Sequence, residues 1–168
     1  VDTMAIPDVD GESALRQEIE VLAAERGTQV LYVRRDTTLE FEDGRTIRLL
    51  APLGSGSTNE EGLTFLASQG DFDVLITGDT GDDVEVQLLS HHHLPQVEVL
   101  AVGHHGPQYS TSQALLEAVK PRYALISVGA DNLYGHPAQE TLERLAASGA
   151  EIYRTDVSGT VTVRANGQ

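Results

Sequence analysis

Three short apolar runs constrain the fold of this chain more than any other feature of its sequence. The runs cover residues 74–77, 97–102 and 123–128, and glycine and polar residues follow each of them. Apolar residues recur at helical spacing in 82–89 and 112–119, between the runs. Short buried strands that alternate with helices indicate a sheet with parallel strands and helices packed outside it.

The first half of the chain predicts antiparallel pairing instead. Segments 38–42 and 46–50 flank Asp43-Gly44, which favours a tight hairpin, and 63–67 precedes 74–77 across a second turn. The remaining predicted elements are strands 1–6 and 30–33, a loop at 54–62, helix 12–26 with a core-facing stripe, helix 137–147 starting at Pro137, and a final hairpin of 152–155 and 161–163. We therefore expect a single domain over residues 1–168 of mixed α/β (α+β) class.

Composition excludes several kinds of site. The 168 residues include no cysteine, so disulfides, thiolate nucleophiles and cysteine-bound zinc are excluded, and any metal must be bound by His, Asp or Glu. The 26 acidic and 11 basic side chains give a net charge of −15, which argues against wide electrostatic capture of nucleic acid. No apolar run approaches the ~18 residues of a membrane span.

The histidines are confined to the second half of the chain. Residues 1–84 carry a net charge of −12 and no histidine, whereas residues 85–168 carry −3 and all six histidines. Metal chemistry should therefore be sought in the second half. The triplet at 91–93 is interpreted as a solvated helix end, at which metal could bind adventitiously.

Asp79 ends the first apolar run, in the sequence Thr77-Gly78-Asp79. A carboxylate at the carboxyl end of a buried strand faces the crevice in which α/β sheets place their sites. Glycine beside it lets a ligand or metal approach closely. The alternative is that Asp79 only caps the next turn or helix.

His104 and His105 follow the second run, within Gly103-His-His-Gly106. Neutral imidazole is the commonest protein ligand for zinc-like metals. Adjacent side chains on an extended segment point to opposite sides. We therefore expect one histidine to bind metal and the other to orient or contact substrate, and the alternative is a pair of loop histidines without a role.

His136 follows the third run and precedes a predicted helix. The amide groups and the positive dipole end of a helix N-terminus favour an anion such as phosphate. A histidine here could bind a substrate oxygen or protonate a leaving group. A helix cap or a hydrogen bond to the backbone is the alternative.

Together the three loops resemble the later part of the metallo-β-lactamase-like domain of ComEC-type DNA-uptake competence proteins. The residues that carry this resemblance span most of 55–165 and are Asn59, Gly62 to Leu66, Thr77-Gly78-Asp79, Gly103-His104-His105-Gly106, Ser110, Ser112, Ile126-Ser-Val-Gly129, Asn132, Tyr134, Gly135, His136 and Pro137.

The resemblance implies a four-layer αββα sandwich and a hydrolytic centre with divalent metal, zinc or alternatively manganese. It implies that Asp79 bridges two metals, that His104 is a metal ligand, and that His105 and His136 act with Asp79 in catalysis. Substrate-binding positions implied in the same way are Ser110, Ser112, Asn132 and Tyr134. The implied reaction is attack of metal-bound hydroxide on a phosphodiester of DNA, in a domain attached to a membrane protein.

One departure from this family is large. The family's early His-x-His-x-Asp-His cluster is absent, because no histidine precedes His91, and Asn59 stands where many relatives hold another histidine. Two protein ligands remain, fewer than the three that catalytic zinc usually keeps. We expect either the carboxyl-terminal portion of a larger domain, beginning within a strand at Val1, or a shortened relative with fewer metal ligands.

The portion alone is expected to be inactive or very weak. It would also expose apolar sheet surface, and should therefore self-associate or be completed by the missing part. Two other functions stay open: a non-catalytic binding or assembly module on the same fold, and a hydrolase for a lactone, a thioester or a small phosphodiester.

Overall fold

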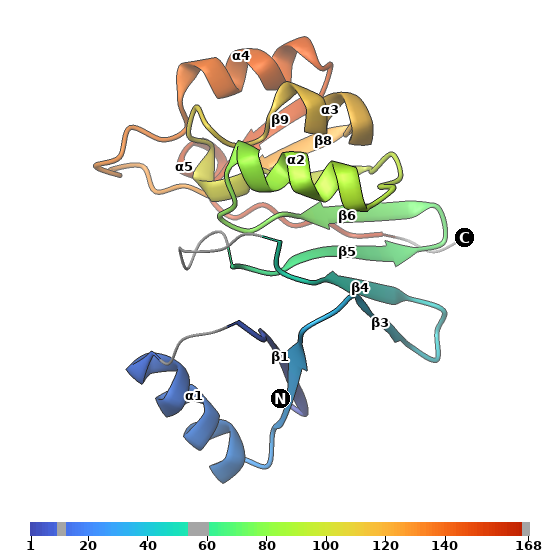
Figure 1. The fold of residues 1–168 in the computed structure, drawn as a ribbon. Coiled ribbons are helices and arrows are strands. Elements are labelled where there is room, and N and C mark those ends of the chain that lie inside the picture. The colour runs from blue at the N-terminus through green and yellow to red at the C-terminus, as the bar shows by residue number, and fades with distance from the viewer. Residues whose placement is uncertain (10–12, 54–60, 166–168) are drawn as a thin grey trace.

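A seven-stranded sheet is the largest element of the computed structural model, which describes residues 1–9, 13–53 and 61–165 (Figure 1). Its strand order follows the chain, from β3 to β9. Neighbours from β3 to β6 are antiparallel, and neighbours from β6 to β9 are parallel. The strands are β3 (Thr37–Glu40), β4 (Thr46–Leu50), β5 (Thr64–Gln69), β6 (Phe72–Ile76), β7 (Val99–Ala101), β8 (Tyr123–Ile126) and β9 (Glu151–Arg154).

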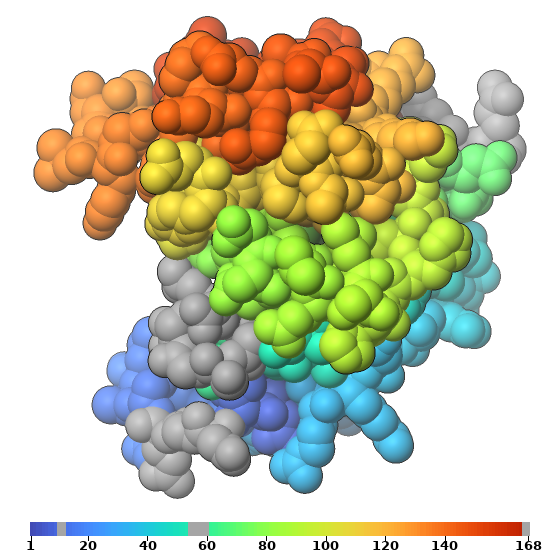
Figure 2. Space-filling view, turned by 45° about the horizontal axis from the view of Figure 1, so that its top comes forward, coloured from blue at the N-terminus to red at the C-terminus, as the bar shows by residue number. Residues whose placement is uncertain are grey.

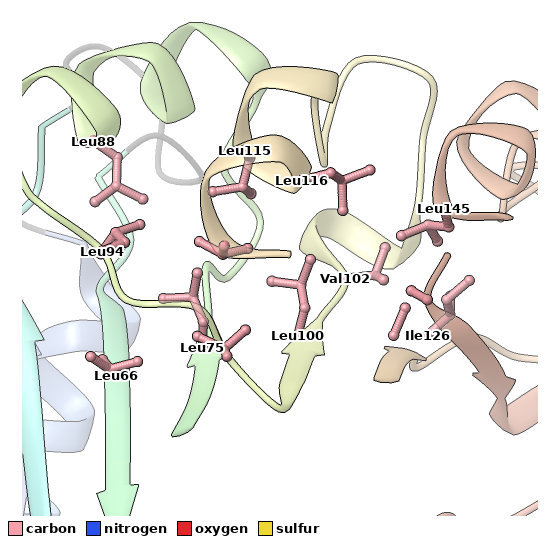
Figure 3. Packing of buried hydrophobic residues seen from close by; sticks show 14 of the residues in the cluster. Leu66, Leu75, Leu88, Leu94, Leu100, Val102, Leu115, Leu116, Ile126 and Leu145 are labelled. Carbon is pink, nitrogen blue, oxygen red and sulfur yellow. The ribbon is translucent and has the colours of Figure 1, made fainter. Parts of the chain in front are cut away.

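Three helices connect the parallel strands and cover one face of the sheet (Figure 1). They are α2 (Asp82–His91), α3 (Gln113–Val119) and α4 (Gln139–Ala147). Alternate residues of the strands, Leu75, Leu100 and Ile126, face them and are at most 1% exposed. Figure 3 shows these side chains packed with leucines of the helices, which form a single apolar cluster. This cluster confirms that the apolar runs are buried strands with helices outside.

The amino-terminal segment forms a separate small sheet. Strands β1 (Thr3–Pro7) and β2 (Gln29–Val33) pair in parallel, and α1 (Ala14–Glu25) connects them (Figure 1). The prediction that the stripe of α1 packs in the core is wrong, because Leu15 is 67% exposed, Leu22 is 51% exposed, and Ala23 is the one residue of the helix that is buried. A two-stranded sheet offers too little surface to cover a whole helical stripe.

The face of the large sheet opposite the three helices is incompletely covered. A cavity of about 730 Å³ separates β1 from this sheet, with Thr3 on one side and Leu49 and Phe65 on the other. Farther along the same sheet, Leu125 and Tyr153 line a cavity of about 300 Å³ that the chain closes near Val163. The described residues therefore place a full helical layer on one face and a partial cover on the other.

The predicted final hairpin is wrong. Strand β9 pairs with β8 in parallel, a four-residue helix α5 (Thr155–Ser158) follows it, and residues 161–163 form no strand. The hydroxyl of Thr155 explains this path, because it accepts the N–H of Val128 and donates to the carbonyl of Val128, both at 2.8 Å. These bonds hold the chain beside the end of β8 directly after β9.

The start of α4 also differs from the prediction. The helix begins at Gln139, with Ala138 as its cap residue, instead of at Pro137. Glu12, which was predicted to open α1, and residues 54–60 of the predicted glycine-rich loop lie outside the described residues. Among the described helices, none has the length and apolar character needed to cross a membrane.

Candidate functional site

Three loops meet at the carboxyl ends of β6, β7 and β8. Because these neighbouring strands are parallel, their ends share one edge of the sheet. The N–H of His104 donates to the carbonyl of Gly78 at 3.0 Å, and the N–H of Ala138 donates to the carbonyl of Gly106 at 2.8 Å. The loops that carry Asp79, His104 and His136 are therefore in direct contact, as the sequence predicts for a shared site.

The histidines of the second and third loops form one cluster. The ring centre of His104 lies 6.3 Å from that of His105, 6.2 Å from that of His136 and 5.6 Å from that of Tyr109. Nδ1 of His105 lies 2.7 Å from the carbonyl oxygen of Ser127. If that nitrogen carries the proton, Nε2 is left as an acceptor or ligand. Asp79 is exposed on the adjoining loop.

The backbone of His104 and His105 is not extended. Residues Gly103–His105 form a 3₁₀ turn, with φ of 50° at His104 and 62° at His105. The assumption of an extended segment, from which a division of roles was inferred, is therefore wrong. Left-handed backbone is uncommon for side chains with a Cβ atom, and it persists where surrounding contacts impose it.

Gly103 provides the close contact that brings the first two loops together. A Cβ atom at this position would lie 2.9 Å from Oγ1 of Thr77 and 3.4 Å from the carbonyl oxygen of Gly78. The Oγ1 atom of Thr77 is itself buried and has no hydrogen-bond partner in the described part of the chain. The absence of a side chain at 103 is therefore what allows the second loop to lie directly on the first.

Glu85 of α2 holds the segment after the histidines. Its side chain is 0% exposed, and its two carboxylate oxygens accept the N–H groups of Thr111 at 2.5 Å and Ser112 at 2.7 Å. Burial raises the pKa of the Glu85 carboxyl, while the hydrogen bonds from Ser112 and Thr111 act in the opposite direction. A buried carboxylate therefore replaces the water that these two amides would otherwise bind.

Arg144 of α4 holds the same segment from the other side. Its guanidinium group donates to the carbonyl oxygens of Thr111 at 3.1 Å, Ser110 at 2.9 Å and Gln108 at 3.2 Å. Glu85 thus binds donors of the loop and Arg144 binds its acceptors. Sequence reasoning missed both residues, although Glu85 lies three positions before Leu88 on the apolar face of α2, which is an available signal.

The serines predicted to contact substrate use their hydroxyl groups within this loop. Oγ of Ser110 donates to the carbonyl of Gly103 at 2.8 Å, and Ser110 is 1% exposed. Oγ of Ser112 accepts the N–H of Leu115 at 3.2 Å and caps α3. In this structure both residues shape the loop.

The third loop is held by the side chain of Asn132. Its amide nitrogen donates to the carbonyls of Gly129 at 2.9 Å and His136 at 2.8 Å, and its amide oxygen accepts the N–H of His136 at 2.9 Å. The His136 ring stacks on Tyr134, with ring centres 5.9 Å apart and planes 16° apart. Asn132 thereby positions both His136 and Tyr134.

A cavity of about 300 Å³ lies beside the histidines. Its lining includes His105, Ser127, Asn132, Tyr134 and His136. Burial lowers the pKa of His136, and the neighbouring imidazoles of His104 and His105 lower it further when they are charged. His136 is therefore kept neutral over more of the range near neutral pH than a free histidine.

The donor atoms present account for only part of a metal centre. Asp79 and His104 offer the oxygen and nitrogen donors that zinc accepts. Over residues 1–9, 13–53 and 61–165, however, no group of three or more His, Asp or Glu side chains is placed to hold a metal ion. The described residues therefore do not form a complete metal site. Asn59 lies outside the described residues.

The prediction that the histidine triplet at 91–93 is solvated holds for two of its residues and is wrong for His92. The side chain of His92 is 9% exposed, and its Nδ1 lies 3.3 Å from Oδ2 of Asp36 and 3.3 Å from the guanidinium of Arg48. His91 and His93 are exposed. Thus His92 serves to attach the end of α2 to the β3–β4 hairpin.

Comparison with known proteins shows similarity to segments of much larger proteins. The chain is 31% identical over 144 residues to "ComE operon protein 3" of Bacillus subtilis, a match that covers 84% of this chain and 18% of the relative. It is 34% identical over 122 residues to "Recombination protein 2" of Haemophilus influenzae, covering 71% of this chain and 15% of the relative. It is 40% identical over 88 residues to "Competence protein ComA" of Neisseria gonorrhoeae, covering 51% of this chain and 13% of that protein.

No protein-family profile matches the sequence. The chain spans at most 18% of the length of these three relatives. The similarity to a protein named for competence agrees with the resemblance seen in the sequence motifs.

Two solved structures show the fold. A protein assigned as a metal-dependent hydrolase from Parabacteroides distasonis superposes with a TM-score of 0.53 at 15% identity, over 92% of this chain and 76% of that chain. A variant of CmlA β-hydroxylase superposes with a TM-score of 0.58 at 13% identity, over 89% of this chain and 37% of that chain. The fold class is confirmed: this is a mixed α/β chain with a metallo-β-lactamase-like fold.

Removing the Glu85 carboxylate should destabilise the protein. We expect Glu85→Ala to lower the free energy of unfolding by about 2–4 kcal/mol, because buried N–H groups lose their partner and a cavity forms. Glu85→Gln, which keeps one acceptor oxygen, should lose less. Urea unfolding measures both, with Glu143→Ala on exposed α4 surface as the matched control at under about 1 kcal/mol. A loss for Glu85→Ala no larger than for Glu143→Ala would contradict this role of Glu85.

His136 should titrate below its ordinary pKa of 6.5. The unfolded chain then binds the proton of His136 more tightly than the folded protein does, so protonation favours unfolding. The contribution of neutral His136 to stability is therefore complete above about pH 6.5 and is lost as the pH falls through the lowered pKa. Two-dimensional NMR of the metal-free protein measures the titration. We expect His104→Gln to raise the pKa of His136, whereas His91→Gln at the far end of α2 should leave it unchanged. A wild-type midpoint at or above 6.5 would disprove the effect.

Proposed function

We propose that this chain is the later part of a ComEC-type metallo-β-lactamase-like domain whose complete form hydrolyses phosphodiester bonds of DNA. The contact between the loops of Asp79, His104 and His136 at one sheet edge is the observation that supports this proposal most. The homologous segments in a protein named for competence and the hydrolase-like fold support it further.

The proposed reaction depends on divalent metal, zinc or manganese. Asp79 and His104 would contribute two ligands, and the others would come from residues outside the described part of the chain. Because catalytic zinc usually keeps three protein ligands, the chain by itself should be inactive or very weak.

The proposed roles of the other residues concern protons and substrate. His136, whose pKa is lowered, is neutral near pH 7 and can accept or pass a proton at the substrate. His105 lines the same cavity with a side chain whose orientation is set by the Ser127 carbonyl. In this proposal Asn132 acts on substrate indirectly, by holding His136 and Tyr134, and Ser110 and Ser112 act by shaping the histidine loop.

The proposal is tested with a longer form of the domain that includes the residues preceding Val1 in its parent protein. With manganese or zinc, this form should cleave labelled single-stranded DNA, and Asp79→Ala and His104→Ala should each reduce turnover at least about 100-fold. Asp71→Ala, an exposed acidic residue in the β5–β6 turn, is the matched control and should retain turnover.

The 168-residue chain assayed alone should show little or no turnover. Robust cleavage by the chain alone that disappears with Asp79→Ala would overturn the inactivity proposed here. No cleavage of DNA by the longer form, combined with turnover of a lactone or thioester, would instead favour a different hydrolase on this fold.

A non-catalytic binding module is the second candidate, and the shortage of metal-binding groups in the described residues favours it. Metal content separates the two functions. If the longer form binds two metal ions per chain and Asp79→Ala lowers that number, the binding-module function is excluded.

We also propose that the incompletely covered face of the large sheet is covered by self-association or by another part of the parent protein. The face includes partly buried Phe65, Leu125 and Tyr153, and cavities lie against it. Large uncovered apolar surfaces are typical of interaction sites. Light scattering should show association of the chain that increases with concentration, and Leu125→Asp should weaken it. A monomer throughout the concentration range would contradict self-association.

A further inference from the structure

Leu133 and Tyr134 form an exposed turn, called the tip below, in the loop between β8 and α4. Leu133 is 97% exposed and Tyr134 is 83% exposed. The loop between β8 and α4, orange at the left of Figures 1 and 2, extends past the rest of the molecule. Side chains with such exposure bury little surface within the protein and remain accessible to solvent.

The exposure of this tip does not arise from a loose loop. Three hydrogen bonds of the Asn132 side chain tie Gly129 to His136 and close the base of the loop. Leu133 and Tyr134 are therefore presented by a braced turn. A ligand that binds there does not have to order the loop first, which lowers the cost of binding.

The Tyr134 ring lies nearly parallel to the His136 ring and is otherwise open to solvent. Its stacking on His136, at an interplanar angle of 16°, fixes its orientation beside the cavity that His105 and His136 line. A ligand that joins a planar group to an anionic group fits this arrangement. Its planar group can stack on the open ring, and its anionic group can lie in the adjoining cavity, which His105 and His136 line.

We propose that Tyr134 is a stacking surface for one unpaired base of a nucleic-acid strand whose neighbouring phosphate enters the adjoining cavity beside His136, whose imidazole has an N–H group to donate. This inference rests on the proposed function and deepens it, because it selects single-stranded substrate. A base must expose its π-face in order to stack on a side chain, and bases inside a duplex are already stacked. Stacking on aromatic residues tolerates every base, so sequence preference should be weak.

The stack also suits a strongly acidic protein. Backbone capture needs basic residues, and the net charge here is −15. Stacking does not require positive charge, so it supplies affinity that the electrostatics of this surface do not provide. Insertion of the tip into a membrane is the competing possibility, but exposed Asp131, two residues before Leu133, and the net acidity oppose contact with an anionic lipid surface.

Binding of fluorescein-labelled oligothymidylate to the chain at low salt, followed by anisotropy, tests the stack. We expect Tyr134→Ala to weaken binding about tenfold and Tyr134→Phe, which keeps the ring, to restore it. Leu133→Ala on the same tip is the matched control and should change binding less than about twofold. An abasic oligonucleotide of equal length should bind the wild type about tenfold more weakly and be insensitive to Tyr134→Ala.

NMR gives a direct readout of the same contact. Ring protons of Tyr134 should shift upfield when oligothymidylate is added, and they should stay in place with the abasic strand. Three results would overturn the stack. They are equal affinity of the wild type and Tyr134→Ala for the oligonucleotide, a loss of affinity with Leu133→Ala as large as that with Tyr134→Ala, and equal affinity of the wild type for the abasic and the intact strand. Binding of the wild type to phosphatidylglycerol vesicles that depends on both Leu133 and Tyr134, without affinity for the oligonucleotide, would replace it with a membrane contact.

The test separates this inference from the proposed function. If the longer form cleaves single-stranded DNA through Asp79 while Tyr134→Ala binds and cleaves as the wild type does, the stack is wrong and the hydrolase proposal stands. If neither form of the wild type binds or cleaves nucleic acid, both proposals are wrong.

Discussion

The geometry of the histidine cluster depends on two oppositely charged side chains that hold one loop from both sides. Glu85 on α2 accepts amide N–H groups of residues 111 and 112, and Arg144 on α4 donates to carbonyls between residues 108 and 111. A loop of this kind would otherwise bring unpaired backbone groups into the protein, at about 1–3 kcal/mol for each group. The two charges let the chain between β7 and α3 bury Ser110 and Thr111, and His104 and His105 lie at the start of that segment.

The parallel half of the sheet then determines which candidate site residues lie close together. Strands β6, β7 and β8 end at the same edge, so three loops far apart in the sequence become neighbours. Each loop has its own internal support: the contact of Gly103 with Thr77, the bonds of Glu85 and Arg144, and the side chain of Asn132. Rigid presentation of this kind is what a site needs in order to position reacting groups.

Local patterns were sufficient to predict the order of strands and helices and the meeting of the three loops. Apolar runs and helical spacing depend on neighbouring residues, and β6 through α4 followed them closely. Structural features that depend on residues distant in the sequence were predicted less well. The pairing of β9 with β8, the exposure of Leu15 on α1 and the burial of His92 are all decided by segments far away in the sequence. For the site, residue types and order indicated Asp79, His104 and His136, whereas Glu85 and Arg144 are recognisable only once α2 and α4 are packed against the loop.

The contact between Gly103 and Thr77 makes the first two loops a single packing unit. With Oγ1 of Thr77 2.9 Å from where a Cβ atom at 103 would lie, neither position can gain bulk unless the other loses it. Exchanging one loop with that of a relative would therefore fail unless the other came with it. In this fold the Thr-Gly-Asp and Gly-His-His-Gly segments, although separated in the sequence by α2 and β7, pack as one unit, so a transfer of this part of the site to another protein would need both segments together.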